Sequence, residues 1–82
     1  MTRLVDLRLV AADALVAHWR SRGEVLPSDT ASRADLVHAA KLYAEVASEL
    51  MVGDDESRAF RRGMLRDALE LRGLVEAGRG VT

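Results

Sequence analysis

The chain lacks cysteine and has one proline and three aromatic residues among 82. Without cysteine, disulfides, thiolate metal sites and cysteine nucleophiles are excluded. With one Trp, one Tyr and one Phe, the core must be built from Leu, Val, Ala and Met. The apolar runs are too short to span a bilayer. Because so short a chain has little core of its own, we expect self-association to stabilise it by burying more apolar surface.

Length and charge indicate one globular domain over residues 1–82. The composition is 49% hydrophobic and 30% charged, with a net charge of −1, which argues against a uniformly basic nucleic-acid coat protein. The N-terminus carries charge within its first apolar stretch and has no signal-peptide apolar region, so we expect a cytoplasmic protein. Of the 12 basic residues, 11 are Arg, and Ile, Asn and Gln are absent. This codon bias indicates a high-GC bacterium or its phage.

Glycine and proline divide the chain into three amphipathic segments. The spacing of apolar residues predicts helices over about 3–22, 29–52 and 55–77, followed by a flexible tail over 78–82. Gly23 suits the position after the first helix. Ser28, Asp29 or Ser32 can cap the second helix, and Asp54 can cap the third. We therefore expect an all-α fold, either a three-helix bundle or a helical hairpin plus a third helix, completed by oligomerisation.

The third predicted helix carries two apolar faces. The inner face comprises Phe60, Met64, Ala68, Leu71, Leu74 and Val75. Leu65 and Leu69 fall on a second face, where we expect contact with another chain. Gly63 and Gly73 lie within this helix at a cost of about 1 kcal/mol each relative to Ala, and such glycines often permit close backbone approach.

The first segment has an alternative interpretation. As a helix, its apolar arc is so wide that it must be covered from two sides. Trp19 lies in this arc and is either a core residue or an interface anchor. Alternatively, residues 3–9 alternate weakly between apolar and polar positions and form a strand.

With a strand at residues 3–9, the chain resembles ribbon-helix-helix DNA-binding proteins. The run Ser32-Arg33-Ala34-Asp35-Leu36-Val37-His38-Ala39-Ala40 resembles the start of that family's second helix, and Arg8-Leu9 resembles the end of its strand. The resemblance covers residues 3–43 and implies a small DNA-binding regulator. The third helix is left unexplained, and the connection from Gly23 to Ser32 is longer than the family's tight turn.

Motifs that carry catalysis or bind cofactors are missing. His18 and His38 lie on different segments, and no His-x-x-x-His, Glu-x-x-His or Asp/Glu-x-His spacing occurs around either of them. There is no Gly-x-Ser-x-Gly motif and no glycine-rich phosphate loop. We therefore expect no enzymatic activity, no catalytic residues, no cofactor and no metal site.

The strongest local signal in the sequence is a cluster of arginines in the third helix. Together with the apolar candidates, it gives a set of partner-binding residues: Trp19, Arg58, Arg61, Arg62, Leu65, Arg66 and Leu69. Arginine next to exposed leucine suits a protein interface. The sequence therefore predicts a protein–protein interaction module, an adaptor, inhibitor or small accessory protein, whose partner is a protein and first of all itself. The alternative is a small DNA-binding transcriptional regulator; no membrane partner is expected.

Overall fold

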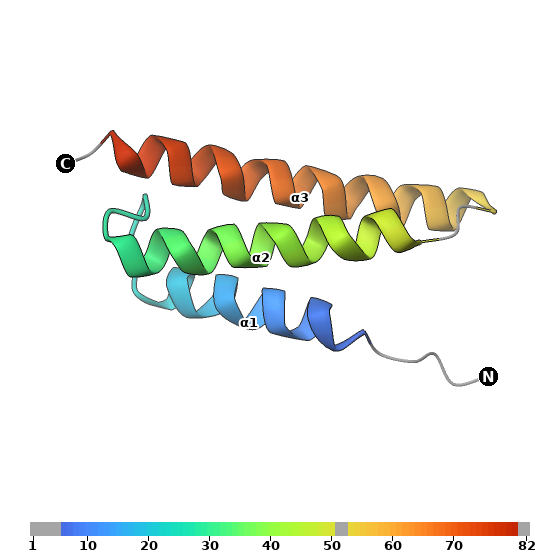
Figure 1. The fold of residues 1–82 in the computed structure, drawn as a ribbon, viewed down its shortest axis with the longest axis horizontal. Helices are drawn as coiled ribbons and strands as arrows, with labels where there is room; N and C mark the ends of the chain where they lie inside the picture. The colour runs from blue at the N-terminus through green and yellow to red at the C-terminus, as the bar shows by residue number, and fades with distance from the viewer. Residues whose placement is uncertain (1–5, 51–52, 81–82) are drawn as a thin grey trace.

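The computed structural model describes residues 6–50 and 53–80, which form three α-helices (Figure 1). These are α1 (Leu7–Ser21), α2 (Thr30–Glu49) and α3 (Asp55–Arg79). The all-α prediction is confirmed over the described residues. α2 lies between the other two helices and packs against both, whereas no Cα atom of α1 lies within 8 Å of one in α3. The molecule is therefore elongated, 47 Å long and 20 by 17 Å across.

Each helix begins at an aspartate that caps it. The carboxylates of Asp6, Asp29 and Asp54 accept the backbone N–H of Arg8 at 2.9 Å, Ser32 at 2.6 Å and Ser57 at 2.7 Å. Capping satisfies N–H groups that have no partner within the helix. The prediction for Asp54 is confirmed, and among the three candidates for α2 the cap is Asp29. The cap at Asp6 is one that the sequence pattern did not single out.

Capping by Asp6 contradicts the alternative of a strand over residues 3–9, and it places the start of the first helix after Asp6 rather than near residue 3. Leu7–Leu9 belong to α1, because Asp6 starts the helix at the next residue; residues 3–5 lie outside the described part of the chain. The end of the strand in the ribbon-helix-helix resemblance, at Arg8 and Leu9, is therefore helical. α2 ends at Glu49, short of the predicted end at 52, and residues 51–52 also lie outside the described part.

Among the described residues, α2 supplies half of the buried apolar side chains, because it is packed on two sides. The buried apolar residues are Ala12, Trp19, Leu36, Ala39, Ala40, Tyr43, Val46, Ala47, Met64, Ala68, Leu71 and Val75. The alanines of α2 let both neighbouring helices approach closely. Tyr43 lies within this core, and its hydroxyl donates a hydrogen bond to Asp13 on α1. Burial, together with this carboxylate, raises the pKa of Tyr43 above its usual range, so the hydroxyl remains a donor.

Arginines join α1 to α2 at both ends of the pair. Arg8 donates to the Glu49 carboxylate at 2.5 and 3.1 Å and to the Asp6 carboxylate at 2.9 Å. Arg22 donates to Asp29 at 3.1 Å. Hydrogen bonds from Arg8 hold the pKa of Asp6 and of Glu49 below their ordinary values. Because charged carboxylates are favoured in the folded chain, they stabilise it above their unfolded pKa.

The Arg8 link predicts a difference in acid sensitivity. Its stabilisation is present at neutral pH and is lost as the pH falls below about 4 through the lowered pKa values of Asp6 and Glu49. We expect Arg8→Met to lower the melting temperature at neutral pH, with the difference from the wild type shrinking in acid. Arg61→Met is the control, because Arg61 is exposed and makes no ion pair among the described residues. Thermal melts across this pH range that show a constant difference for Arg8→Met would contradict the prediction.

The predicted tail over 78–82 is wrong at its first two residues. α3 continues to Arg79, and Gly78 is buried against the loop between α1 and α2. A Cβ atom at Gly78 would lie 2.2 Å from the Pro27 carbonyl oxygen. Gly78 is therefore a packing residue rather than the end of the helix. Gly23 has the predicted role, since its φ of +73° follows the last turn of α1 in the left-handed region.

Candidate functional site

Six of the seven partner-binding candidates lie together on α3. All six are exposed: Arg58, Arg61, Arg62, Leu65, Arg66 and Leu69. Leu69 has 70% of its surface exposed. α3 buries one face against α2 and leaves these side chains on the rest of its circumference. The sequence periodicity thus placed Leu65 and Leu69 correctly outside the core.

A shallow groove runs along this part of α3. It has a volume of about 610 Å³ and is lined by Ala59, Arg62, Gly63, Leu65, Arg66 and Leu69. We call this surface, together with the exposed residues that follow it at 70, 73, 76 and 77, the outer face of α3. The groove exists because Gly63 has no side chain between the longer side chains around it. A Cβ atom at Gly63 would meet nothing within 4 Å, so the fold of the single chain does not require glycine there.

The middle of the outer face carries unpaired positive charge. The ion pairs within α3 join Arg58 to Asp55 at 3.7 Å and Arg79 to Glu76 at 3.2 Å. In the described part of the chain, neither Arg62 nor Arg66 has a carboxylate within 4.0 Å. Their guanidinium groups are therefore available for bidentate hydrogen bonds to an approaching carboxylate.

Trp19 does not join this surface. It lies in the core, almost entirely buried, on the side of α1 that faces α2. Its indole N–H has no hydrogen-bond partner among the described residues. Helical periodicity left open whether Trp19 is a core residue or an interface anchor, and the packing places it inside.

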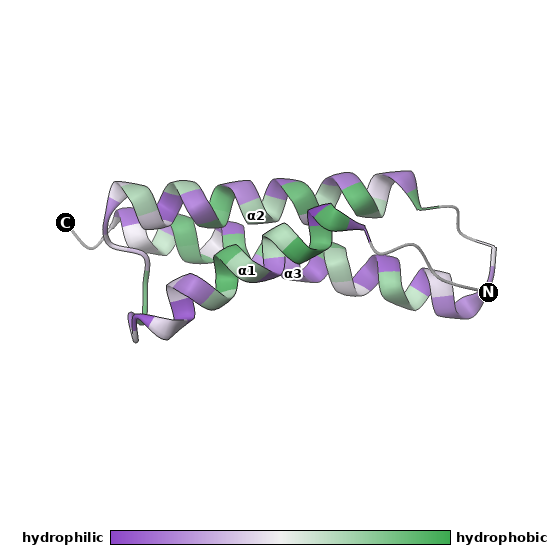
Figure 2. Cartoon of the chain, turned by 90° about the horizontal axis from the view of Figure 1, so that it is seen from below, coloured by the Kyte–Doolittle hydropathy of each residue, from purple (hydrophilic) through white to green (hydrophobic). Residues whose placement is uncertain are grey.

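A second exposed apolar surface lies on α1. α1 packs only against α2, so its other side is left uncovered. Leu7, Val10, Ala11, Ala14 and Ala17 are all exposed there, and Figure 2 shows much of α1 in the hydrophobic colour. The stripe carries no charge, and nothing within it selects one partner. It accounts for the unusually wide apolar arc of the first segment.

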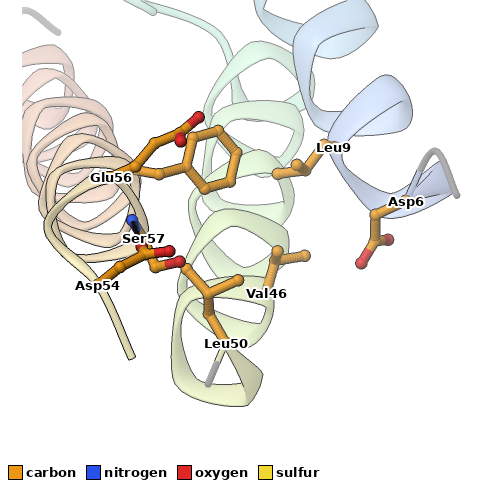
Figure 3. Close-up of a pocket in the computed structure, with 8 residues that line it drawn as sticks. Asp6, Leu9, Val46, Leu50, Asp54, Glu56 and Ser57 are labelled. Atoms are coloured by element: carbon orange, nitrogen blue, oxygen red, sulfur yellow. Dashed lines mark hydrogen bonds between the residues drawn. The ribbon is translucent and has the colours of Figure 1, made fainter. Parts of the chain in front are cut away.

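A cleft opens where the N-terminal ends of α1 and α3 flank the end of α2 (Figure 3). It has a volume of about 440 Å³ and includes Leu9, Val46, Leu50 and Phe60. Phe60, predicted to belong to the inner face of the third helix, is instead half exposed. The reason is that α1 does not approach α3, so this end of the core is left open.

Two acidic side chains at the cleft, those of Asp6 and Asp54, have structural roles. Asp6 caps α1 and binds Arg8, and Asp54 caps α3. Within residues 6–50 and 53–80, no three His, Asp or Glu side chains converge in a way that would hold a metal ion. In the same part of the chain, no helix combines the length and the apolar character needed to cross a bilayer.

The candidate functional sites among the described residues are therefore the outer face of α3, the exposed side of α1 and the cleft. Comparison of the chain with protein-family models, with curated proteins and with solved structures found no match.

Proposed function

We propose that this protein is a non-enzymatic protein–protein interaction module that self-associates through the outer face of α3. The observation that carries the proposal is the exposure of Leu69 in a groove that is also lined by Arg62 and Arg66, two arginines without an ion pair among the described residues. Interfaces combine a central apolar side chain with arginine more often than the rest of a protein surface does. The structural use of Asp6 and Asp54 as helix caps supports a role other than catalysis.

Self-association is favoured over a heterologous partner by the size of the chain. An 82-residue chain whose helices α1 and α3 share only α2 has a thin core. A second copy adds apolar contact without adding sequence. An adaptor, an inhibitor or a small accessory protein would each work through such a face.

DNA binding is the second candidate. It is favoured by Arg61, Arg62, Arg66 and Arg72, which are all exposed on one helix and without ion pairs among the described residues. Contacts between arginine and phosphate weaken steeply as salt rises, whereas apolar contacts do not. Salt dependence therefore separates the two functions.

The test is sedimentation equilibrium over a wide range of protein concentration, at low and high salt, with and without mixed-sequence duplex DNA. We expect the wild type to associate at both salt concentrations without gaining mass from DNA. We expect Leu69→Ser to weaken association about ten-fold or more, because truncating a central interface side chain costs about 1–2 kcal/mol.

Val25→Ser is the matched control. Val25 is 86% exposed and lies in the loop between α1 and α2, outside the outer face of α3, so its replacement should leave association unchanged. A chain that stays monomeric at every concentration would overturn the proposal. A chain that gains mass from DNA only at low salt would replace the proposal with the DNA-binding function.

A further inference from the structure

We infer that the partner is a second copy of this chain whose α3 lies antiparallel to the first, with the two-fold axis close to residue 68. The inference rests on the proposed function and specifies its geometry. Six positions form a seam along the outer face of α3: Ala59, Gly63, Arg66, Glu70, Gly73 and Ala77. None of them is buried. Their alternating spacing of four and three residues is that of the contact line between two packed helices.

This seam is self-complementary when it is read backwards. Read from residue 59 to 77, the order is Ala, Gly, Arg, Glu, Gly, Ala. Read from 77 to 59, it is Ala, Gly, Glu, Arg, Gly, Ala, so each arginine position matches a glutamate position. In an antiparallel pair, each Arg66 therefore lies opposite Glu70 of the second copy. A parallel pair would place Arg66 against Arg66 and Glu70 against Glu70, which is electrostatically unfavourable. The charges therefore favour a second copy of the chain as the partner, and they favour the antiparallel orientation of the two α3 helices.

The residues beside the seam agree with the same alignment. With the axis at residue 68, Arg62 lies within one helical turn of Glu76 of the second copy, and Leu69 lies close to its own counterpart. Glu76 pairs with Arg79 in the single chain at 3.2 Å, but both side chains are largely exposed, so this surface pair is readily exchanged. Leu69, the exposed leucine nearest the two-fold axis, is thereby covered without a cavity in the partner.

The two mid-helix glycines provide an independent observation. A Cβ atom at Gly63 or at Gly73 would meet nothing within 4 Å, so neither glycine is needed for packing within the chain. Each nevertheless weakens the helix relative to alanine. In the antiparallel pair, Gly63 lies opposite Gly73 of the second copy on both sides of the axis, and the two backbones approach closely at these points. The seam extends over about 27 Å, at 1.5 Å per residue.

The test is a charge exchange between two variants. The acidic-face variant carries Arg62→Glu and Arg66→Glu, and the basic-face variant carries Glu70→Arg and Glu76→Arg. We expect each variant alone to associate about ten-fold or more weakly than the wild type, because like charges then face each other. An equimolar mixture should recover a heterodimer, identified by native mass spectrometry and sedimentation equilibrium, since every pair then joins opposite charges.

A control variant with Arg61→Glu and Arg72→Glu changes net charge by the same amount as the acidic-face variant. Both residues are exposed on α3, but helical periodicity puts them away from the seam, so association should persist. Circular dichroism melts check that every variant folds. The variants Gly63→Gln and Gly73→Gln give a second readout: each should raise the melting temperature of the dilute chain and weaken its association.

The outcomes separate this inference from the function on which it rests. If Leu69→Ser weakens association but the mixed charge variants form no heterodimer, the antiparallel geometry is overturned and the proposed function as an interaction module is retained. Variants that associate alone as strongly as the wild type would also overturn the geometry. A wild-type chain that is monomeric throughout would overturn both.

Discussion

Gly78→Ala is expected to destabilise the folded chain by about 2–3 kcal/mol, the cost of forcing extra volume into a close-packed contact. The added Cβ would lie 2.2 Å from the Pro27 carbonyl oxygen and 3.0 Å from its carbonyl carbon. Because these are backbone atoms, no rotation of a flexible side chain relieves the overlap. Either the C-terminal end of α3 or the loop between α1 and α2 has to move.

The measurement is a thermal melt of dilute protein followed by far-UV circular dichroism. For a domain of this size, 1 kcal/mol corresponds to about 4–8 °C in melting temperature, so we expect a fall of about 10–20 °C. Gly73→Ala is the matched control, because the same substitution in the same helix meets no atom within 4 Å. It should stabilise the chain by up to about 1 kcal/mol. Equal melting temperatures for the two variants would show that α3 does not contact Pro27 as closely as described.

Leu36→Ala is expected to have an effect of similar or larger size. Leu36 lies on α2 and is completely buried, and leucine-to-alanine changes in cores cost about 3–5 kcal/mol. Two of its neighbours in sequence on the buried side, Ala39 and Ala40, are small, and they cannot fill the space that is left. Small proteins are stable by only about 5–15 kcal/mol, so this one change should remove a large part of the total.

Val37→Ala tests whether the effect comes from burial rather than from helix propensity. Val37 is the next residue of the same helix and is 43% exposed, so its truncation should cost well under the effect at Leu36. Chemical denaturation of the two variants, analysed with a common slope, gives the comparison. A loss of stability at Leu36 no larger than at Val37 would contradict the placement of α2 at the centre of the core.

Local signals in the sequence predicted the three helices but not all of their ends. Asp54 and Gly23 mark the start of α3 and the end of α1, because capping and left-handed backbone depend on the residues at the helix end. The exposure of Leu65 and Leu69 also followed from periodicity, which tells one side of a helix from the other. The cap at Asp6 was missed because the sequence pattern indicated a helix from about residue 3 or, alternatively, a strand over residues 3–9, and either one places Asp6 inside the element.

The candidate site was therefore only partly predictable. Periodicity grouped the arginines and leucines on one helix. The structure adds the groove at Gly63 and shows that, within residues 6–50 and 53–80, no carboxylate forms an ion pair with Arg62 or Arg66. Trp19 was assigned to the partner-binding set because its side of the helix is apolar, but an apolar side alone does not say which surface covers it.

The sequence by itself indicated three helices and the positions at which the chain turns between them, because these properties depend on residues close together in the chain. Only the tertiary structure decided that α2 is shared by α1 and α3, and that α1 and α3 do not meet. That arrangement leaves Phe60 half exposed, encloses Trp19 and makes Gly78 a tight contact. Each of these outcomes depends on which helices approach each other and how closely, and periodicity along a single helix carries no information about that distance.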